Sequence, residues 1–168
     1  GCSSQVRPNT IEFGPNGYLW VGVGNGCTIP WTGNNYNGVA KIQKYSTSGS
    51  LLFSFGESGH YVDFTDSAGV YHSDTPGNGE FGQRGVTSIT FDGGYMFVTA
   101  GGNDRIQKFT LGGSFVELYD FHGFSWADGN SGPSAVAVKD QKIYIIGKHR
   151  EDISDKSGIF TFPELQAI

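Results

Sequence analysis

The sequence predicts an all-β fold, and three observations support this prediction. The chain of 168 residues has 27 glycines and 14% aromatic residues but only 16% charged residues, a composition typical of short strands joined by tight turns. Apolar residues alternate with small or polar ones over short stretches, as in half-buried strands. The motifs "KIQKY" (41–45) and "RIQKF" (105–109) each precede a glycine-containing turn and an apolar strand, so the pattern recurs.

Three units of strands follow one another along the chain. Each unit opens with an alternating strand, continues through a polar turn, and reaches a more apolar strand that we expect to be buried on both faces. The opening pairs of strands are "TIEF" and "YLWVGV" (10–13 and 18–23), "SITF" and "YMFVTA" (88–91 and 95–100), and "AVAV" and "KIYIIG" (135–138 and 142–147). We expect Trp20, Phe97 and Tyr144, which lie in the apolar strands, to be core residues.

Further strands complete the units. The third strands are "AKIQKYS", "DRIQKFT" and "SGIFTFP" (40–46, 104–110 and 157–163), and the fourth are "SLLFSF" and "SFVELYDF" (50–55 and 114–121). Four antiparallel strands per unit, repeated, are typical of the blades of a β-propeller. The sequence therefore predicts one propeller-like domain over residues 1–168, with blades at roughly 9–59, 77–123 and 132–168. The insertion at 60–76 should form an extra hairpin or a flap.

The second unit resembles an NHL repeat. The family pattern is Gly-x-Gly-x-Phe, an apolar strand, Asp-Gly, an aromatic strand, Asn-Arg-Ile-Gln-Lys-Phe, then glycine and another apolar strand. "GNGEF" (77–81) and "SITFDGGYMFVTAGGNDRIQKFTLGGSFV" (88–116) carry this resemblance. The first unit keeps "GPNGYLWV" and "KIQKYSTSGSLLFSFG", and the third keeps only the rhythm of strands. The resemblance implies a propeller and makes a non-catalytic binding or assembly module the leading functional hypothesis.

Three blades are fewer than the roughly 4 to 8 of known propellers. Open sheet edges would expose unpaired backbone groups. We therefore expect either a fragment of a longer chain or a homo-oligomer, for example two three-bladed halves of a six-bladed ring. In the second case, "CSSQVRP" (2–8) of a neighbouring copy would supply the missing fourth strand of the third unit.

Composition and the amino-terminal residues bear on partners and location. A net charge of −5 gives no basic footprint for nucleic acid, and no apolar run approaches the roughly 20 residues of a membrane span. "GCSS" (1–4) resembles the end of a bacterial lipoprotein signal, with Cys2 as the lipidated residue; a cloning remnant is the alternative. Cys2 and Cys27 could also form a disulfide. These features favour an extracellular or cell-surface protein.

The candidate ligand-binding residues fall in the longer links between strands. In a four-stranded meander, the links between strands two and three and those between blades lie on one face, where we expect His60, His122, His149, Trp31 and Trp126 together. The full set of candidates is Trp31, Tyr36, His60, His72, His122, Trp126 and His149. Aromatic rings beside imidazoles and carboxylates suit a protein or a glycan. The alternative is that these long loops are merely polar, as loops usually are.

Three function classes follow from this pattern. The first is a non-catalytic module that holds a protein or glycan through the loop-rich face or the sheet edges, and it needs no cofactor. The second is a metal-dependent lyase or hydrolase, which the family resemblance implies, with His60, His122 and His149 as ligands for Zn²⁺ or Ca²⁺. The third is a structural subunit of an oligomer or filament. The chain has no recognised zinc spacing, EF-hand loop, P-loop or nucleophile elbow, and so a non-enzymatic role is favoured.

The basic residues of the third strands have an architectural interpretation. We expect Lys41, Arg105 and Lys108 to lie on outer strands, where their stems cover apolar surface and their charged heads reach water.

Overall fold

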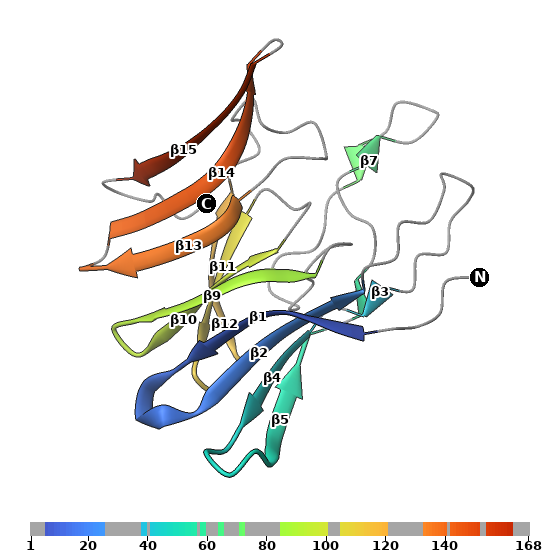
Figure 1. Ribbon diagram of the computed structural model, residues 1–168, viewed down its shortest axis with the longest axis vertical. Coiled ribbons are helices and arrows are strands. Elements are labelled where there is room, and N and C mark those ends of the chain that lie inside the picture. Colours follow the sequence, from blue (N-terminus) through green and yellow to red (C-terminus); the bar gives the residue numbers. More distant parts are fainter. Residues whose placement is uncertain are drawn as a thin grey trace.

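A computed structural model describes residues 6–25, 38–39, 41–56, 58–59, 64–65, 71–72, 85–100, 105–120, 133–140, 142–151 and 154–162. The described strands are antiparallel, and the helical content of these ranges is one 3-10 turn, η1 (Pro15–Gly17). Two sheets have four strands and a third has three (Figure 1). The prediction of an all-β fold built from four-stranded antiparallel sheets is confirmed. No helix within these ranges has the length and apolar character of a membrane span.

The first sheet is a meander in the order β1-β2-β4-β5. Its strands are β1 (Val6–Phe13), β2 (Leu19–Asn25), β4 (Lys41–Tyr45) and β5 (Leu51–Phe55). Each contains or closely matches a strand expected from the alternation of apolar and polar residues.

The second sheet repeats this meander. Its strands are β9 (Val86–Asp92), β10 (Tyr95–Ala100), β11 (Arg105–Thr110) and β12 (Phe115–Asp120), in that spatial order. The turn between its last two strands has the same hydrogen bonds as the matching turn of the first sheet. Thr110 N donates to Ser114 O at 2.8 Å and Ser46 N donates to Ser50 O at 2.8 Å, while a glycine with positive φ, Gly113 or Gly49, occupies the same place in each turn. The sequence repeat is therefore also a structural repeat.

The third sheet has the order β13-β14-β15. Its strands are β13 (Pro133–Lys139), β14 (Lys142–Glu151) and β15 (Ser154–Phe162). We expected residues 147–157, which include His149, to form a link between strands, and this expectation was wrong. β14 and β15 stay paired as far as Glu151 opposite Ser154, so that the backbone groups of this segment bond across a ladder.

Short strands lie outside the three main sheets. β3 (Gly38–Val39) pairs with β6 (Ser58–Gly59), and β7 (Phe64–Thr65) pairs with β8 (Tyr71–His72) inside the insertion.

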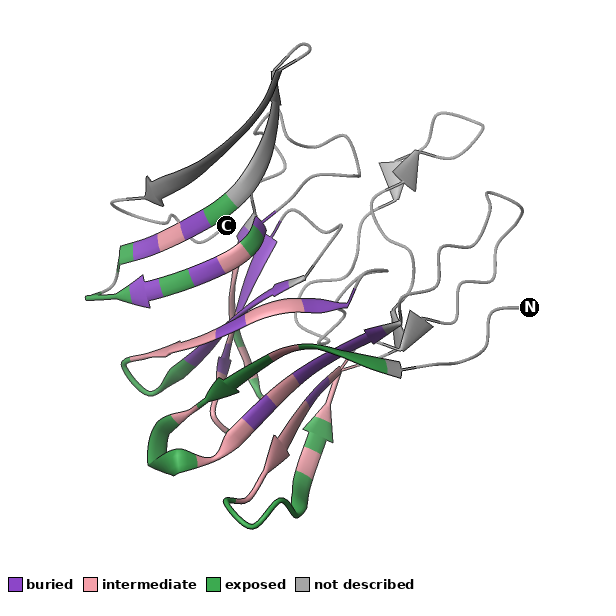
Figure 2. Ribbon diagram, in the orientation of Figure 1, coloured by how far each residue is buried: buried purple, intermediate pink, exposed green. Residues whose placement is uncertain are grey.

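The hydrophobic core consists of two clusters that lie between successive sheets (Figure 2). The first joins the first and second sheets through Trp20, Ile42, Val86, Ile89, Met96, Val98 and Phe109. The second joins the second and third sheets through Phe97, Ile106, Tyr119, Val136, Val138, Ile143 and Ile145. The second sheet is thus covered on both faces.

The burial of the aromatic strands differs between the sheets. Trp20 and Phe97 are buried, as predicted, but Tyr144 is only half-buried and Ile146 is exposed. The expectation that the second strand of every unit is buried on both faces is therefore wrong for β2, where Leu19 and Val21 are only half-buried, and for β14. Its residues Ile143 and Ile145 face the second sheet, and no described sheet covers the opposite face.

The three sheets fan out from one another in the order first, second, third (Figure 1). β9 contacts β1, β2 and β13, and β10 contacts β13, so the second sheet lies between the other two. Over the residues that the structure describes, the sheets do not close into a ring.

Candidate functional site

The first sheet presents an apolar face to solvent. Because Trp20 and Ile42 point into the core, the residues that alternate with them point the other way. Phe13 lies opposite Leu19, Leu19 opposite Tyr45, and Tyr45 opposite Leu51, which makes a row across all four strands. We use the name outer face of the first sheet for the apolar residues on this side, which are Ile11, Phe13, Leu19, Val21, Tyr45 and Leu51. Gln43 and Ser54 continue the row from Ile11 and Val21 and lie on the same side.

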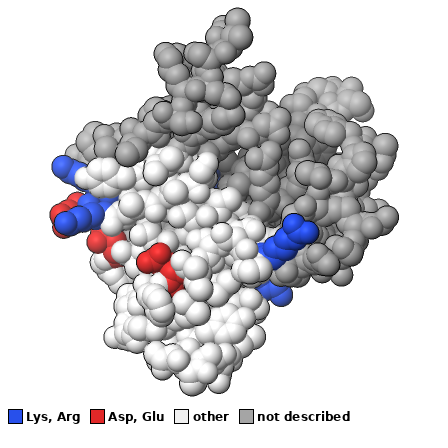
Figure 3. All heavy atoms as spheres, in the orientation of Figure 1, with Lys and Arg blue, Asp and Glu red and all other residues white. Residues whose placement is uncertain are grey.

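Several of these side chains are exposed to an unusual degree. Phe13 is 72% exposed, Ile11 63% and Leu51 51%, and Leu52 at the neighbouring β-bulge is 49% exposed. Figure 3 shows a broad area with few charged side chains over the lower part of the molecule, where Figure 1 places β1, β2, β4 and β5. Contiguous apolar surface of this kind marks an interaction site more often than scattered apolar residues do.

The second sheet has the same face, but there it is covered. The aligned repeats match Ile11 and Phe13 with Ile89 and Phe91, Leu19 and Val21 with Met96 and Val98, and Tyr45 and Leu51 with Phe109 and Phe115. All six residues of the second sheet belong to or pack against the core cluster shared with the first sheet. The outer face of the first sheet is therefore of a kind that this chain elsewhere buries against another sheet.

The third sheet has an open face at the other end of the stack. We use the name outer face of the third sheet for the residues Ala135, Ala137, Tyr144 and Ile146. Ala137 lies opposite Tyr144, and Ala135 lies opposite Ile146. Ile146 is 48% exposed. Tyr144 aligns with Phe97 of the second sheet and Trp20 of the first, and both of those rings pack toward the following sheet.

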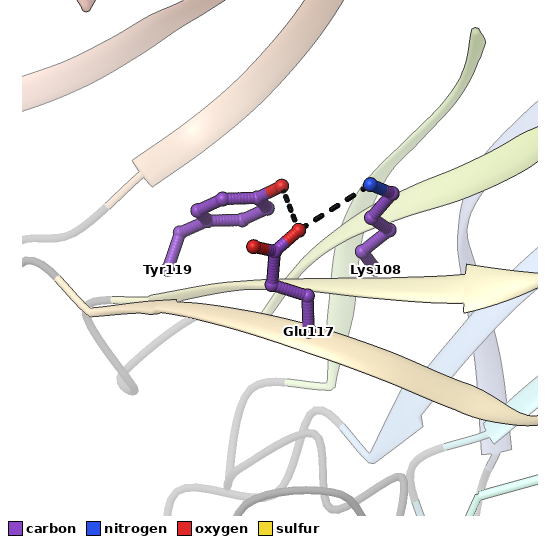
Figure 4. A network of polar contacts seen from close by, with 3 residues as sticks. All are labelled: Lys108, Glu117 and Tyr119. Carbon is purple, nitrogen blue, oxygen red and sulfur yellow. Dashed lines mark hydrogen bonds and ion pairs between the residues drawn. The ribbon is translucent and has the colours of Figure 1, made fainter. Parts of the chain in front are cut away.

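A polar cluster lies on the face of the second sheet that meets the third (Figure 4). Lys108 Nζ lies 3.3 Å from Glu117 Oε2, and the Tyr119 hydroxyl donates a short hydrogen bond to the same oxygen. Burial is the largest cause of a Tyr119 pKa well above the usual tyrosine value, and the hydrogen bond to Glu117 and its negative charge add to it. Tyr119 therefore stays protonated at neutral pH and acts as a hydrogen-bond donor.

The lysines of the third strands lie over aromatic rings. Lys108 Nζ is 4.5 Å from the ring centre of Tyr95, and Lys44 Nζ is 4.2 Å from Tyr18 and 5.0 Å from Trp20. Such contacts are cation–π interactions.

The architectural interpretation of the predicted basic residues needs one correction. Lys41 and Lys108 are half-buried, which is compatible with stems that cover apolar surface. Arg105 is only 5% exposed, so its head does not reach water as expected. It opens β11, and because its side chain alternates with that of Ile106, which faces the third sheet, it lies on the face toward the first sheet.

The structure describes the backbone of two of the predicted ligand-binding residues. His72 lies in β8 opposite Phe64, and His149 lies in β14 opposite Lys156. The other predicted ligand-binding residues lie outside the described ranges; they are Trp31, Tyr36, His60, His122 and Trp126. Cys2 and Cys27 lie outside these ranges as well. The shared face, the metal site of His60, His122 and His149, and the disulfide therefore stay predictions. Among the described residues, no three His, Cys, Asp or Glu side chains gather as metal ligands would.

The outer face of the first sheet did not figure among the predicted site residues. Its signal was present in the sequence, because Ile11 and Phe13 align with Ile89 and Phe91. Only the arrangement of sheets shows that one pair is covered and the other is exposed.

No protein-family model matches the chain, and no curated protein matches its sequence. The class that the structure defines is an all-β protein of stacked antiparallel sheets. The resemblance to NHL repeats and the extracellular location stay predictions.

Proposed function

We propose that this chain is a non-catalytic binding or assembly module of the NHL β-propeller type, and that it holds a protein partner through the outer face of its first sheet. The observation that carries the proposal is the exposure of Phe13, Ile11 and Leu51, whose counterparts in the second sheet are packed against another sheet.

The repetition of local structure supports blades as the building units. The turns at Ser46–Ser50 and Thr110–Ser114 have the same hydrogen bonds, and a β-bulge follows Lys44 in one sheet and Lys108 in the other. Stacked four-stranded meanders that repeat such details are the architecture of propeller blades.

The chemistry of the face favours a protein over a glycan. A sugar site combines rings with polar groups that fix hydroxyl orientation. The most exposed large side chains here are Phe13, Ile11, Leu51 and Leu52, which offer apolar area. The polar groups of the same face are few, namely Ser54, Gln43 and the Tyr45 hydroxyl, and that hydroxyl already donates to Gln43 Oε1 at 3.2 Å. Burial of such area gives about 25 cal/mol per Å², which is the usual driving force of protein association.

A matched set of variants tests the proposal. The tagged wild-type chain, a double variant Ile11→Thr/Phe13→Thr, and a control Thr47→Ala in the exposed β4–β5 turn would each be used to retrieve polypeptides from cells that make the untagged chain. Threonine suits an exposed strand position, so the fold should persist. We expect at least one polypeptide, identified by mass spectrometry, to be retrieved by wild type and control and lost at least tenfold with the double variant. Equal retrieval by all three baits would refute the proposal.

A further inference from the structure

The two ends of the stack present complementary faces. The outer face of the first sheet corresponds to the side of the second sheet that packs on the first. The outer face of the third sheet corresponds to the face of the first sheet that packs on the second. It also corresponds to the face of the second sheet that packs on the third. One end therefore offers the kind of surface that the other end accepts.

The packing inside the chain shows how two such faces meet. Trp20 reaches Phe91 of the next sheet with ring centres 5.6 Å apart, and its counterpart Phe97 shares a cluster with Val138. Tyr144 occupies the position in the third sheet that Trp20 and Phe97 occupy in the first and second. Phe13 occupies the position in the first sheet that Phe91 and Val138 occupy in the second and third. A contact between Tyr144 and Phe13 would continue the two observed contacts between sheets.

Charge does not oppose this contact. The residues that define the two outer faces include no carboxylate, ammonium or guanidinium group, and Lys41 lies at the end of the first face, opposite Val23. Lys139 and Lys142 lie opposite each other at the β13–β14 turn, where they continue the outer face of the third sheet; both are exposed, and their long stems let the ammonium groups stay in water. Association would therefore bury apolar side chains without a charge left unpaired.

Building on the proposed function, we infer that the partner is a second copy of this chain, whose third-sheet outer face packs on the first-sheet outer face. Joining unlike faces gives a heterologous contact, which closes into a ring if the rotation allows and otherwise forms a filament. Two copies related by a twofold axis form two such contacts and close the ring if the fan of sheets in each copy (Figure 1) spans half a turn. The ring would contain six sheets, within the range of roughly 4 to 8 that closed propellers use.

Solution mass and cross-linking test this inference on the purified full chain. Light scattering after size exclusion should give about twice the single-chain mass of 18.1 kDa. Phe13→Asp and Tyr144→Asp should each halve the measured mass, because either one places a charge in the contact. Val116→Asp, a control at an exposed apolar position of the second sheet, should leave it unchanged. Circular dichroism would establish that each variant keeps the β fold.

Cross-linking identifies the face that is contacted. A benzophenone amino acid in place of Phe13, in a mixture of ¹⁵N-labelled and unlabelled chains, should yield mixed-isotope cross-links to β14 near Tyr144. A monomer, or cross-links from position 13 to β1 or β2 of the other copy, would overturn the inference, and a filament would overturn the closed ring of two copies. If Phe13-dependent retrieval then finds a different polypeptide, the proposed function stands without the second copy. If it finds none, both fail.

Discussion

Replacing Trp20 by alanine tests the packing of the first two sheets. Trp20 is 1% exposed, and its ring centre lies 5.7 Å from that of Phe53 and 5.6 Å from that of Phe91. Loss of a buried Trp side chain costs about 3–5 kcal/mol through lost transfer energy and the cavity left behind, and ring pairs add to this. With a urea m-value of roughly 2 kcal/mol/M, a loss of about 4 kcal/mol moves the unfolding midpoint down by about 2 M.

Two further variants sharpen this experiment. Tyr95→Ala removes a ring that is 38% exposed and contacts Lys108, so it should cost about 1 kcal/mol. Trp20→Phe should cost far less than Trp20→Ala, because Phe97 fills the matching position in the second sheet and Trp20 Nε1 has no hydrogen-bond acceptor within the described part of the chain. Urea unfolding followed by circular dichroism measures all three. Equal midpoint shifts for Trp20→Ala and Tyr95→Ala would refute the interpretation of Trp20 as the centre of this core.

Three other predictions follow from the same contacts. Gly22→Ala should destabilise the chain by about 1–3 kcal/mol in urea unfolding, because a Cβ there would lie 2.4 Å from Val86 Cγ1; Gly112→Ala, whose Cβ would meet only Thr110 Oγ1 at 3.7 Å, should not. Since the raised pKa of Tyr119 keeps it protonated while unfolded tyrosines ionise above about pH 10, stability should fall as the pH rises beyond that value, and less steeply in Tyr119→Phe. Parallel pH profiles for the two proteins would contradict this. Deleting residues 60–76 should leave the three main sheets folded, because β7 and β8 pair with each other among the described strands; loss of the β-sheet circular dichroism signal would show that the insertion is structural.

The strands could be predicted from the sequence because each carries its own local signal. Alternation in "SITF" and "YMFVTA", with glycines between them, located β9 and β10 to within two residues. Burial was less predictable, because it depends on which neighbour covers each face. Phe13 and Phe91 have the same local pattern, yet only Phe91 has a sheet packed on it. Arg105 shows the same limit, since its charge indicated exposure but its side chain is only 5% exposed.

The candidate site was predictable only in part. Chemistry-bearing side chains were expected in the links between strands, and one of them, His149, lies in a strand. Apolar residues such as Ile11 gave no such signal, because an aliphatic side chain in a strand is ordinarily core. Their exposure becomes apparent only when the order of sheets is known.

The position of the second sheet between the other two has a consequence for how the molecule opens. When a fluctuation loosens the first sheet, the third sheet still covers β10, and the reverse also holds. The amides of β10 should therefore exchange with solvent last, and only through global unfolding. Where each unit gains stability mainly from the unit beside it, cooperativity spreads along the chain by nearest-neighbour coupling, as in repeat proteins. Lengthening the array by one unit would then add the free energy of one new interface, and the terminal sheets would remain the first to exchange.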